Sequence, residues 1–376
     1  MSVAAARDRS GPLHGVRVVE FAGVGPAPYA CMLLADMGAE IVTILPPAGR
    51  GAAGPLPFQT DPMMRGRSAI ELDVKTGTGR DAALAIASAA DLLVEGFRPG
   101  VMERLGLGPD TCLDRNPKLI YGRMTGWGQD GPMAQSAGHD PNYLSITGAL
   151  FSIGEAGGAP VQPLNLVGDF GGGGAFLVIG LLAALVDARQ SGIGQVVDAA
   201  MVDGAASLMT AAYSMRNAGM WIDRRGSNLI DGGAPFGACY ATSDGGHMAV
   251  CAVEPKFYSA FVEGLGFDEA TLPKRVDRRN WQALRSLFAD RFATRTRAEW
   301  SAIFEGREAC VTAVLDMGEA PEHSHNRSRS VFVTHEGKPV PAAAPRFAGT
   351  PSRVSPQAGP AIGERLAHWG VSLTQV

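Results

Sequence analysis

Residues 15–44 have the sequence pattern of a strand, a helix and a second strand, and this pattern restricts the chain to a small group of folds. Residues 15–21 are apolar and β-branched enough for a buried strand, and the stretch from Gly23 to Pro28 ends it. Residues 29–37 then keep apolar side chains on one helical face, and residues 39–44 are again typical of a buried strand. This order predicts an α/β fold with a parallel sheet.

The same alternation continues along the chain. We expect strands at 69–74, 91–95 and 119–124, with helices at 79–90 and 101–105, and therefore a mostly parallel, doubly wound sheet. Residues 50–62, rich in Gly, Pro and Ala, are predicted to be a surface loop, and helical periodicity dominates 175–220 except at 192–195. Strand-like segments at 238–241 and 247–253, with helices near 256–265 and 280–293, indicate a smaller α+β domain over roughly 230–335.

The composition narrows the class of protein. The 376 residues are 46% hydrophobic, enough for two domain cores, and a net charge of −4 without long runs of one sign argues against nucleic-acid and membrane partners. Five dispersed cysteines without a C-x-x-C pair argue against disulfides and zinc and favour a reducing, cytoplasmic setting. The longest apolar run, 175–186, is too short to span a bilayer, and residues 1–12 lack the apolar core of a signal peptide.

The loop after the first predicted strand argues against a nicotinamide or flavin cofactor. Gly23 and Gly25 have the spacing of a dinucleotide-binding loop, but the third glycine is missing and Pro26 follows directly. The second predicted strand ends in Leu45 and Pro46 rather than in the acidic residue that binds a ribose. We therefore expect no redox cofactor.

Asp169 is the most informative polar residue, because four glycines, 171–174, and then an apolar helix follow it. One interpretation is an ordinary helix N-cap. The other is functional: glycines let a substrate carbonyl approach the backbone, and free N–H groups at a helix start stabilise an oxyanion. A carboxylate there would serve as a base or as a nucleophile.

His139 and Glu254 are the other candidates. His139 follows the strand expected at 119–124, in the region where α/β proteins place ligands, and an imidazole exchanges protons near neutral pH. Glu254 stands at the end of an apolar strand, and a carboxylate can orient such an imidazole. The plain alternatives are a hydrogen-bonded loop histidine and a capping glutamate before Pro255.

Several segments resemble the family III CoA-transferase superfamily, and the likeness, with its order of motifs, covers nearly the whole chain. They are RVVEFAG at 17–23, EGFRPG at 95–100, YGRMTGWG at 121–128, GDF at 168–170 and GQVVD at 194–198. Within that superfamily, GHD at 138–140 together with VEP at 253–255 is similar to the α-methylacyl-CoA racemase branch. Transferases of this fold share the aspartate at 169 but generally lack this His and Glu pair.

The resemblance implies a fold, an assembly and a reaction. The expected fold is a Rossmann-like CoA-binding domain over 1–200 completed by a return segment at 336–376, a helical linker at 201–229 and a small domain at 230–335. Two chains would form an interlocked homodimer, in which Glu254 of one reaches His139 of the other. The expected reaction interconverts (R)- and (S)-2-methylacyl-CoA thioesters through an enolate, with His139 and Asp169 as the two bases and no cofactor beyond the CoA of the substrate.

The resemblance also implies a CoA site, with one departure from the family pattern. Related racemases carry a phosphate-facing arginine where this chain has Leu45, Pro46 and Pro47, so Arg50, Arg65 or Arg67 would have to substitute. The residues expected to contact CoA are Arg67, Leu72, Asp73, Val74, Lys75, Gly96, Phe97, Arg98, Arg104, Gly138, Asp140, Tyr143 and Asn165.

Two other functions fit the same residues. In a CoA-transferase Asp169 would attack the acyl-CoA to form a mixed anhydride, and His139 would be unnecessary. In a catalytically silent CoA-binding dimer none of the three residues would react. Exchange of the α-proton with solvent separates these functions, because only the racemase exchanges it without an acceptor acid.

Overall fold

The structure, a computed structural model, describes residues 11–48 and 56–372, which divide into two compact units. The first unit contains the described residues up to Thr147, Pro163–Met209, and the described residues from Arg327 onward. The second contains Gly148–Gln162 and Thr210–Asn326. This division differs from the boundaries expected from the sequence mainly at 148–162, which belong with the second unit, and at the proposed linker 201–229, which is shared between the two.

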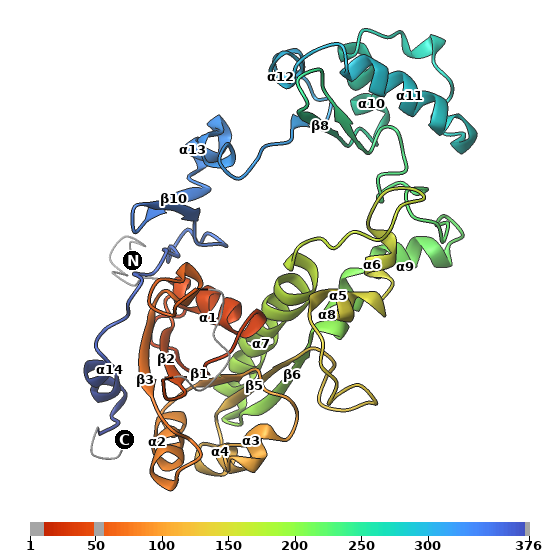
Figure 1. The fold of residues 1–376 in the computed structure, drawn as a ribbon. Helices are drawn as coiled ribbons and strands as arrows, with labels where there is room; N and C mark the ends of the chain where they lie inside the picture. The colour runs from red at the N-terminus through yellow and green to blue at the C-terminus, as the bar shows by residue number, and fades with distance from the viewer. Residues whose placement is uncertain (1–10, 49–55, 373–376) are drawn as a thin grey trace. The chain divides into compact units, whose positions relative to one another are not determined.

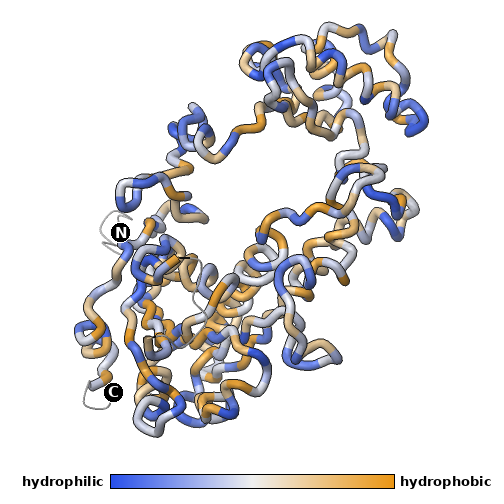
Figure 2. The backbone as a smooth tube through the Cα atoms, in the orientation of Figure 1, coloured by the Kyte–Doolittle hydropathy of each residue, from blue (hydrophilic) through white to orange (hydrophobic). Residues whose placement is uncertain are grey.

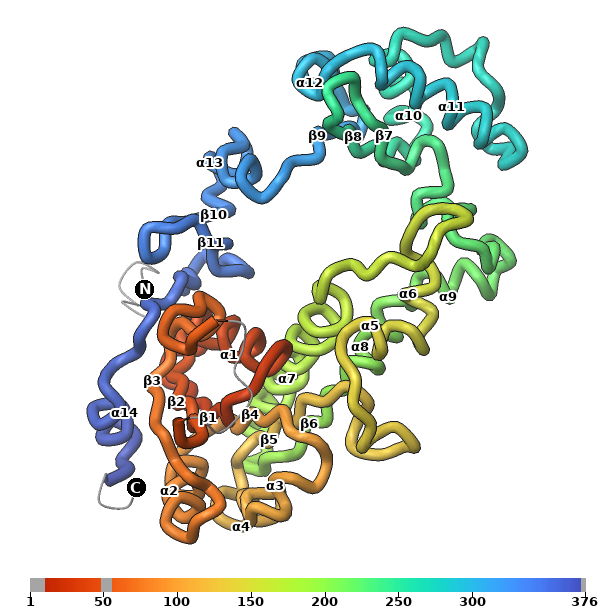
Figure 3. Tube along the Cα trace, viewed as in Figure 1, coloured from red at the N-terminus to blue at the C-terminus, as the bar shows by residue number. Residues whose placement is uncertain are grey.

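The first unit is built on a six-stranded sheet whose neighbouring strands are all parallel (Figure 1), in the order β3-β2-β1-β4-β5-β6, with β4 labelled in Figure 3. The chain moves outward from β1 to β3 on one side and then from β4 to β6 on the other, so the direction of winding reverses between β1 and β4. Ligands of doubly wound sheets bind at such a point. The strands are β1 (Arg17–Phe21), β2 (Glu40–Leu45), β3 (Arg67–Glu71), β4 (Leu92–Glu95), β5 (Ile120–Thr125) and β6 (Gln195–Ala200).

Successive side chains of a strand point to opposite faces of the sheet, and each face of this sheet is covered by helices. Val18 and Leu92 pack into a core with α1 (Pro26–Asp36) and α7 (Phe176–Ser191). Their neighbours Val19 and Leu93 pack into a second core with α2 (Gly77–Ser88), α4 (Pro109–Arg115) and α14 (Ile362–Trp369). Figure 2 shows hydrophobic stretches along these strands, and Figure 3 shows α14 beside β3. The sheet therefore has a layer of helices on each face, as expected of a doubly wound fold.

Two features of the first unit differ from the sequence-based expectation. Residues 196–200, expected to be helical, belong to the edge strand β6. The first half of this strand is largely exposed, so it lacks the apolar run of a buried strand. The helix expected to begin near Ala175 begins at Leu166, as a π-helical segment η3 (Leu166–Ala175) that continues into α7. Asp169 is therefore inside a helix and is not its N-cap.

The combined helix Leu166–Ser191 is longer than the apolar run predicted from the sequence. Within the described ranges it is the one helix that is long and apolar enough to cross a membrane, judged by length and composition. Its residues pack against α1, α8 (Met201–Leu208), β5 and β6. These contacts are those of a core helix in an α/β sheet.

The second unit is a small antiparallel sheet covered by helices. Its strands β7 (Cys239–Ala241), β8 (His247–Val250) and β9 (Val311–Ala313) are joined in that order. Aromatic side chains such as Phe261, Phe288 and Phe292 form its core with α10 (Pro255–Gly264), α11 (Trp281–Phe292) and α12 (Arg297–Phe304). Arg225 donates hydrogen bonds to carbonyl oxygens of Phe151, Glu155 and Gly158, which explains why residues 148–162 belong to this unit.

The other helices and strands are α3 (Val101–Arg104), α5 (Asp140–Ser145), α6 (Ala149–Ser152), α9 (Thr210–Asn217), α13 (Ser324–Arg329), β10 (Phe332–His335) and β11 (Lys338–Pro341), with short 3₁₀ turns η2 (Pro62–Met64), η4 (Glu269–Thr271), η5 (Arg278–Asn280) and η6 (Ala320–Glu322).

Candidate active site

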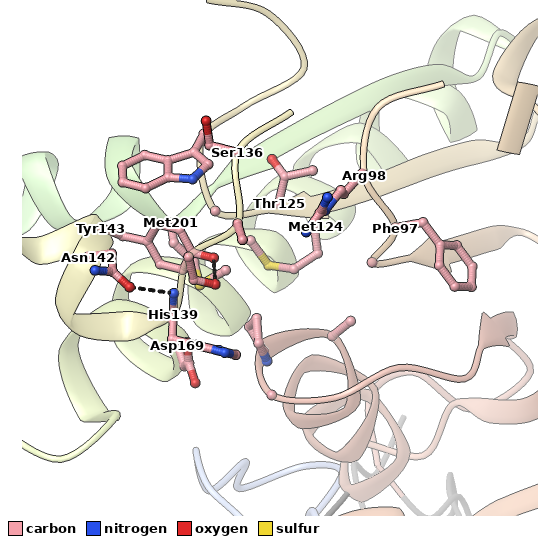
Figure 4. Close-up of a pocket in the computed structure, with 18 of the residues that line it drawn as sticks. Phe97, Arg98, Met124, Thr125, Ser136, His139, Asn142, Tyr143, Asp169 and Met201 are labelled. Carbon is pink, nitrogen blue, oxygen red and sulfur yellow. Dashed lines mark hydrogen bonds between the residues drawn. The ribbon is translucent and has the colours of Figure 1, made fainter. Parts of the chain in front are cut away.

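A pocket of about 450 Å³ lies in the first unit, at the carboxyl ends of β1, β4 and β5. Its walls come from the loop before α1, the loop after β4, the end of β5, and the segment that leads into α5. His139 and Asp169 line it together, next to each other in Figure 4. The pocket lies where the winding of the sheet reverses, which is the position expected of a ligand site.

The loop after β1 brings the N-terminus of α1 to the pocket. Gly25 precedes the helix with φ of 73° and ψ of −121°, a backbone conformation that glycine adopts readily. Pro26 and Pro28 carry no N–H, so Ala27 supplies the one amide among the first three residues of the helix. A Cβ on Gly25 would lie 3.4 Å from Oδ2 of Asp169. The glycine therefore leaves room beside the carboxylate.

The loop after β4 is fixed by a buried charge network. Glu95 is completely buried, accepts the N–H of Phe97 at 2.7 Å and accepts Nε of Arg123 at 2.9 Å. Arg123 also donates to Glu103 at 2.8 Å. Burial raises the pKa of the Glu95 carboxyl, and the charge of Arg123 opposes this shift. The network holds Phe97 and the exposed Arg98 at the pocket rim.

The segment that carries His139 is fixed by its neighbours on α5. The His139 N–H donates to Oδ1 of Asn142 at 3.0 Å, and the hydroxyl of Tyr143 donates to the carbonyl of Gly138. The ring of Tyr143 packs edge-on against Trp127, with ring centroids 4.8 Å apart. These contacts hold the backbone, while the His139 side chain stays exposed at the pocket wall (Figure 4).

Asp169 projects from η3 and is partly buried. Burial raises the pKa of its carboxyl, and the negative charge of Asp140 raises it further. A hydrogen bond from Nδ2 of Asn165, at 3.4 Å from Oδ2, and the charge of His139 act in the opposite direction. The electrostatic effect of His139 agrees with Figure 4, which draws the two side chains close together. The pocket thus holds one imidazole and one carboxyl of increased proton affinity.

The structure brings many of the residues expected from the sequence to this pocket. Those that line it are Gly96, Phe97, Arg98, Gly138, His139, Tyr143 and Asp169. Asn165 and Asp140 do not line it but hydrogen-bond to Asp169, through its carboxylate and its backbone N–H respectively. Arg104 is exposed at the end of α3, and Asp73, Val74 and Lys75 form the turn between β3 and α2.

Two expected contact residues are buried in the protein instead. The Arg67 side chain is completely inaccessible, and its nitrogens donate to Glu20 and to the carbonyl groups of Met63, Arg65 and Pro28. A phosphate cannot reach it, so its assignment to the CoA site is wrong. Leu72 is likewise a core residue of the face that α2 covers.

The arginine missing after β2 is not replaced by Arg65 either. Arg65 forms a buried ion pair with Asp36, with Nε 2.9 Å from Oδ1. Arg50, the third candidate, lies outside the described residues.

Sequence reasoning missed part of the pocket wall. Val24, Gly25 and Ala27 line the pocket, although the sequence pattern of residues 23–28 was interpreted as a chain break without a ligand-binding role. Trp127 and Met201 also line the pocket. The position of 23–28 at the carboxyl end of the first strand was the available signal, because ligand-binding loops in α/β folds begin there.

Glu254 belongs to the second unit. It precedes α10 at the N-cap position, but its side chain makes no capping hydrogen bond, and it is exposed. The capping interpretation therefore does not describe this carboxylate. In the described part of the chain, no group of three or more His, Cys, Asp or Glu side chains is placed to hold a metal ion.

A doubly wound sheet with a His and Asp pocket at its switch point defines a class of α/β enzyme, and comparison with known proteins identifies the family. The model of CoA-transferase family III matches residues 13–366, and the chain belongs to this family. Among curated proteins, it is 44% identical to the alpha-methylacyl-CoA racemase of Mus musculus, over 97% of this chain and 95% of that protein.

Two further matches agree with this assignment. The Homo sapiens alpha-methylacyl-CoA racemase is 42% identical over the same shares of the two chains. Among solved structures, Rv3272 from M. tuberculosis matches with a TM-score of 0.77 and 26% identity, covering 96% of this chain and 100% of that one.

Proposed function

We propose that this chain is a racemase of 2-methylacyl-CoA thioesters that moves the α-proton by way of an enolate. The observation that carries the proposal is the shared position of His139 and Asp169 in one pocket at the switch point of the sheet. Racemisation needs a base on each face of the α-carbon, because the proton leaves from one side and returns to the other. The likeness to two racemases over nearly the whole chain supports the same reaction.

The two bases exchange roles between the two directions of the reaction. In one direction the Asp169 carboxylate removes the α-proton while protonated His139 delivers a proton to the opposite face. In the other direction His139 removes the proton and the Asp169 carboxyl delivers one. The raised pKa of Asp169 suits this double role. It makes the ionised carboxylate a stronger base, and it lets the protonated carboxyl keep its proton at a pH nearer to neutral.

The thioester oxygen becomes negative in the enolate and needs hydrogen-bond donors. The N–H of Asp169 is not available for this role, because it donates to Asp140 at 2.8 Å. Helix α1 begins at Pro26, which lines the pocket, and α5 begins directly after His139, which also lines it. The N-terminus of a helix favours negative charge. These two helix starts are the proposed stabilisers of the enolate.

Arg98 and Arg104 are the proposed phosphate contacts of CoA, with Gly96 and Phe97 beside them. Arginine suits phosphate because its planar fork of donors matches the phosphate oxygens. A homodimer in which Glu254 of a second copy pairs with His139 remains part of the proposal. It is tested by co-expressing His139→Ala and Glu254→Ala chains: mixed dimers regain activity only if the two residues of one site come from different chains.

Deuterium exchange tests the proposed reaction. In D₂O without any acceptor acid, the enzyme should incorporate deuterium at C2 of a 2-methylacyl-CoA and interconvert its epimers. His139→Ala and Asp169→Ala should each reduce epimerisation by about 10² to 10⁴, the usual contribution of general acid–base catalysis. Near-normal epimerisation by either variant would contradict the two-base scheme.

The same assay measures the alternative of CoA transfer. A transferase that uses Asp169 as nucleophile would form the CoA thioester of an acceptor acid, and only when that acid is added. The His139→Ala variant would keep this transferase activity. A protein that binds CoA silently would show neither reaction.

A further inference from the structure

Asp140, which follows His139 and begins α5, makes contacts that the two-base scheme does not use. It does not line the pocket, however, and is only 3% exposed. Its Oδ2 accepts the backbone N–H of Asp169 at 2.8 Å. One residue therefore joins the segment of one proposed base to the backbone of the other.

The hydrogen bond satisfies a donor that the helix itself cannot satisfy. Asp169 is in the first turn of η3, where backbone N–H groups have no acceptor within the helix. Asp140 caps this donor from a different element. The close approach depends on Gly168, because a Cβ there would lie 2.5 Å from Oδ2 of Asp140.

The second oxygen of Asp140 is unusual. Oδ1 is buried and has no hydrogen-bond partner among the described residues. A buried carboxylate oxygen normally finds a donor, and leaving it without one costs free energy. The negative charge of Asp140 acts on the carboxyl of Asp169.

Among the titratable groups around Asp169, Asp140 is one of two whose charge changes the pKa of the Asp169 carboxyl. The titratable or charged groups on α5 and on the elements that contact η3 are His139, Asp140, Tyr143, Tyr29, Cys31, Asp36, Asp187, Arg189, Asp203, Tyr121, Arg123 and Asp198. Of these, Asp140 and His139 change the proton affinity of Asp169, in opposite directions.

We propose that Asp140 is a positioning residue for Asp169: its side chain accepts the Asp169 N–H from a different element, fixes the Asp169 backbone at the pocket wall, and adds a second negative charge near the Asp169 carboxyl. The benefit to catalysis rests on the proposed racemase reaction. The electrostatic part does not, because it concerns the proton affinity of one carboxyl in the protein without substrate.

The first test is a carboxyl titration that does not depend on activity. Aspartate labelled with ¹³C at the carboxyl carbon is titrated by NMR, and the Asp169→Asn variant identifies the signal of Asp169. Asp140→Asn keeps an oxygen acceptor for the Asp169 N–H but removes the charge, so the pKa of Asp169 should fall. Asp198→Asn is the matched control, since Asp198 also accepts a backbone N–H, that of Gln129 at 3.2 Å, and should leave the Asp169 signal unchanged.

The second test separates positioning from stability. Asp140→Asn should move the acid limb of the pH–rate profile for deuterium exchange to lower pH. Gly168→Ala displaces the Asp140 carboxylate without removing its charge and should reduce kcat by about 10² with little change in KM, as expected when a reacting group moves by roughly 1 Å. An Asp169 titration in Asp140→Asn equal to that of the unchanged protein would overturn the proposal, whether or not the protein exchanges the α-proton. Loss of thermal stability alone, with an unchanged pH profile, would also overturn it.

Discussion

The guanidinium of Arg67 lies 2.6 Å from Oε2 of Glu20, and neither side chain exposes more than 1% of its surface. This ion pair joins β3 to β1 under the helix α1, where Arg67 also donates to the carbonyl of Pro28. Removing one partner of a buried pair leaves the other charge without compensation. The pair is therefore structural, and it explains why an arginine near the expected phosphate site does not bind phosphate.

We expect Arg67→Met to reduce the free energy of unfolding by about 3–5 kcal/mol, because Glu20 would stay buried and unpaired. Urea denaturation of the purified variant measures this change. Arg80→Met is the control: Arg80 forms an exposed pair with Asp81 at 3.5 Å, and its loss should cost about 0–1 kcal/mol. A folded, fully stable Arg67→Met protein with weakened CoA binding would restore the rejected role in the CoA site.

Gly25→Ala should impair both stability and turnover. The φ of 73° at this position disfavours any residue with a Cβ, at a cost of about 1–3 kcal/mol. The added methyl group would lie 3.4 Å from the Asp169 carboxylate and occupy space beside the reacting group. Deuterium-exchange kinetics should show a lower kcat. Gly131→Ala, also at positive φ but with open space around its Cβ position, should lose stability alone.

Asn165→Ala should move the acid limb of the kcat/KM profile to higher pH. The Asp169 carboxyl must be ionised to act as a base, so activity in that direction falls as pH decreases through its pKa. Burial has already raised this pKa, and the hydrogen bond from Asn165 lowers it. Removing the bond raises the pKa further. Asn280→Ala, which loses a comparable bond to the carbonyl of Lys274 in the second unit, should leave the profile unchanged.

Arg98→Met should weaken binding of CoA and make the remaining affinity less dependent on salt. The side chain is exposed at the pocket rim, where its charge can meet a phosphate. Isothermal titration with CoA at two ionic strengths measures both effects. Arg189→Met, in the last turn of α7 and absent from the pocket wall, is the charge-matched control. Equal affinity of the two variants would exclude Arg98 as a phosphate contact.

The fold could be predicted from the sequence wherever burial repeats regularly. Residues 17–21 and 92–95 are buried almost throughout, and such apolar runs mark central parallel strands. The edge strand β6 escaped detection because exposure on its outer side removes that signal. The π-helical segment was also missed, since consecutive glycines at 171–174 do not indicate a helix by propensity.

Two residues of the candidate site could be selected from the sequence, because residue type limits the chemistry that a side chain can perform. His139 and Asp169 stand out as polar side chains in apolar and glycine-rich surroundings. Their common pocket follows from the sheet order, which brings the ends of β1, β4 and β5 to one edge. The roles of Arg67 and Asp140 could not be predicted, because residue type does not say which partner a charge finds.

By itself, the sequence determined the parallel α/β architecture, the polar pair His139 and Asp169 as candidates for proton transfer, and the family, since these depend on local periodicity and residue identity. Only the tertiary structure decided which charges face the pocket and which are neutralised inside. Arg67 and Arg98 are chemically identical, yet one is enclosed by Glu20 and backbone carbonyls while the other is exposed at the pocket rim. Solvent access and the nearest opposite charge are properties of three-dimensional packing, and they fix what an ionisable group can bind.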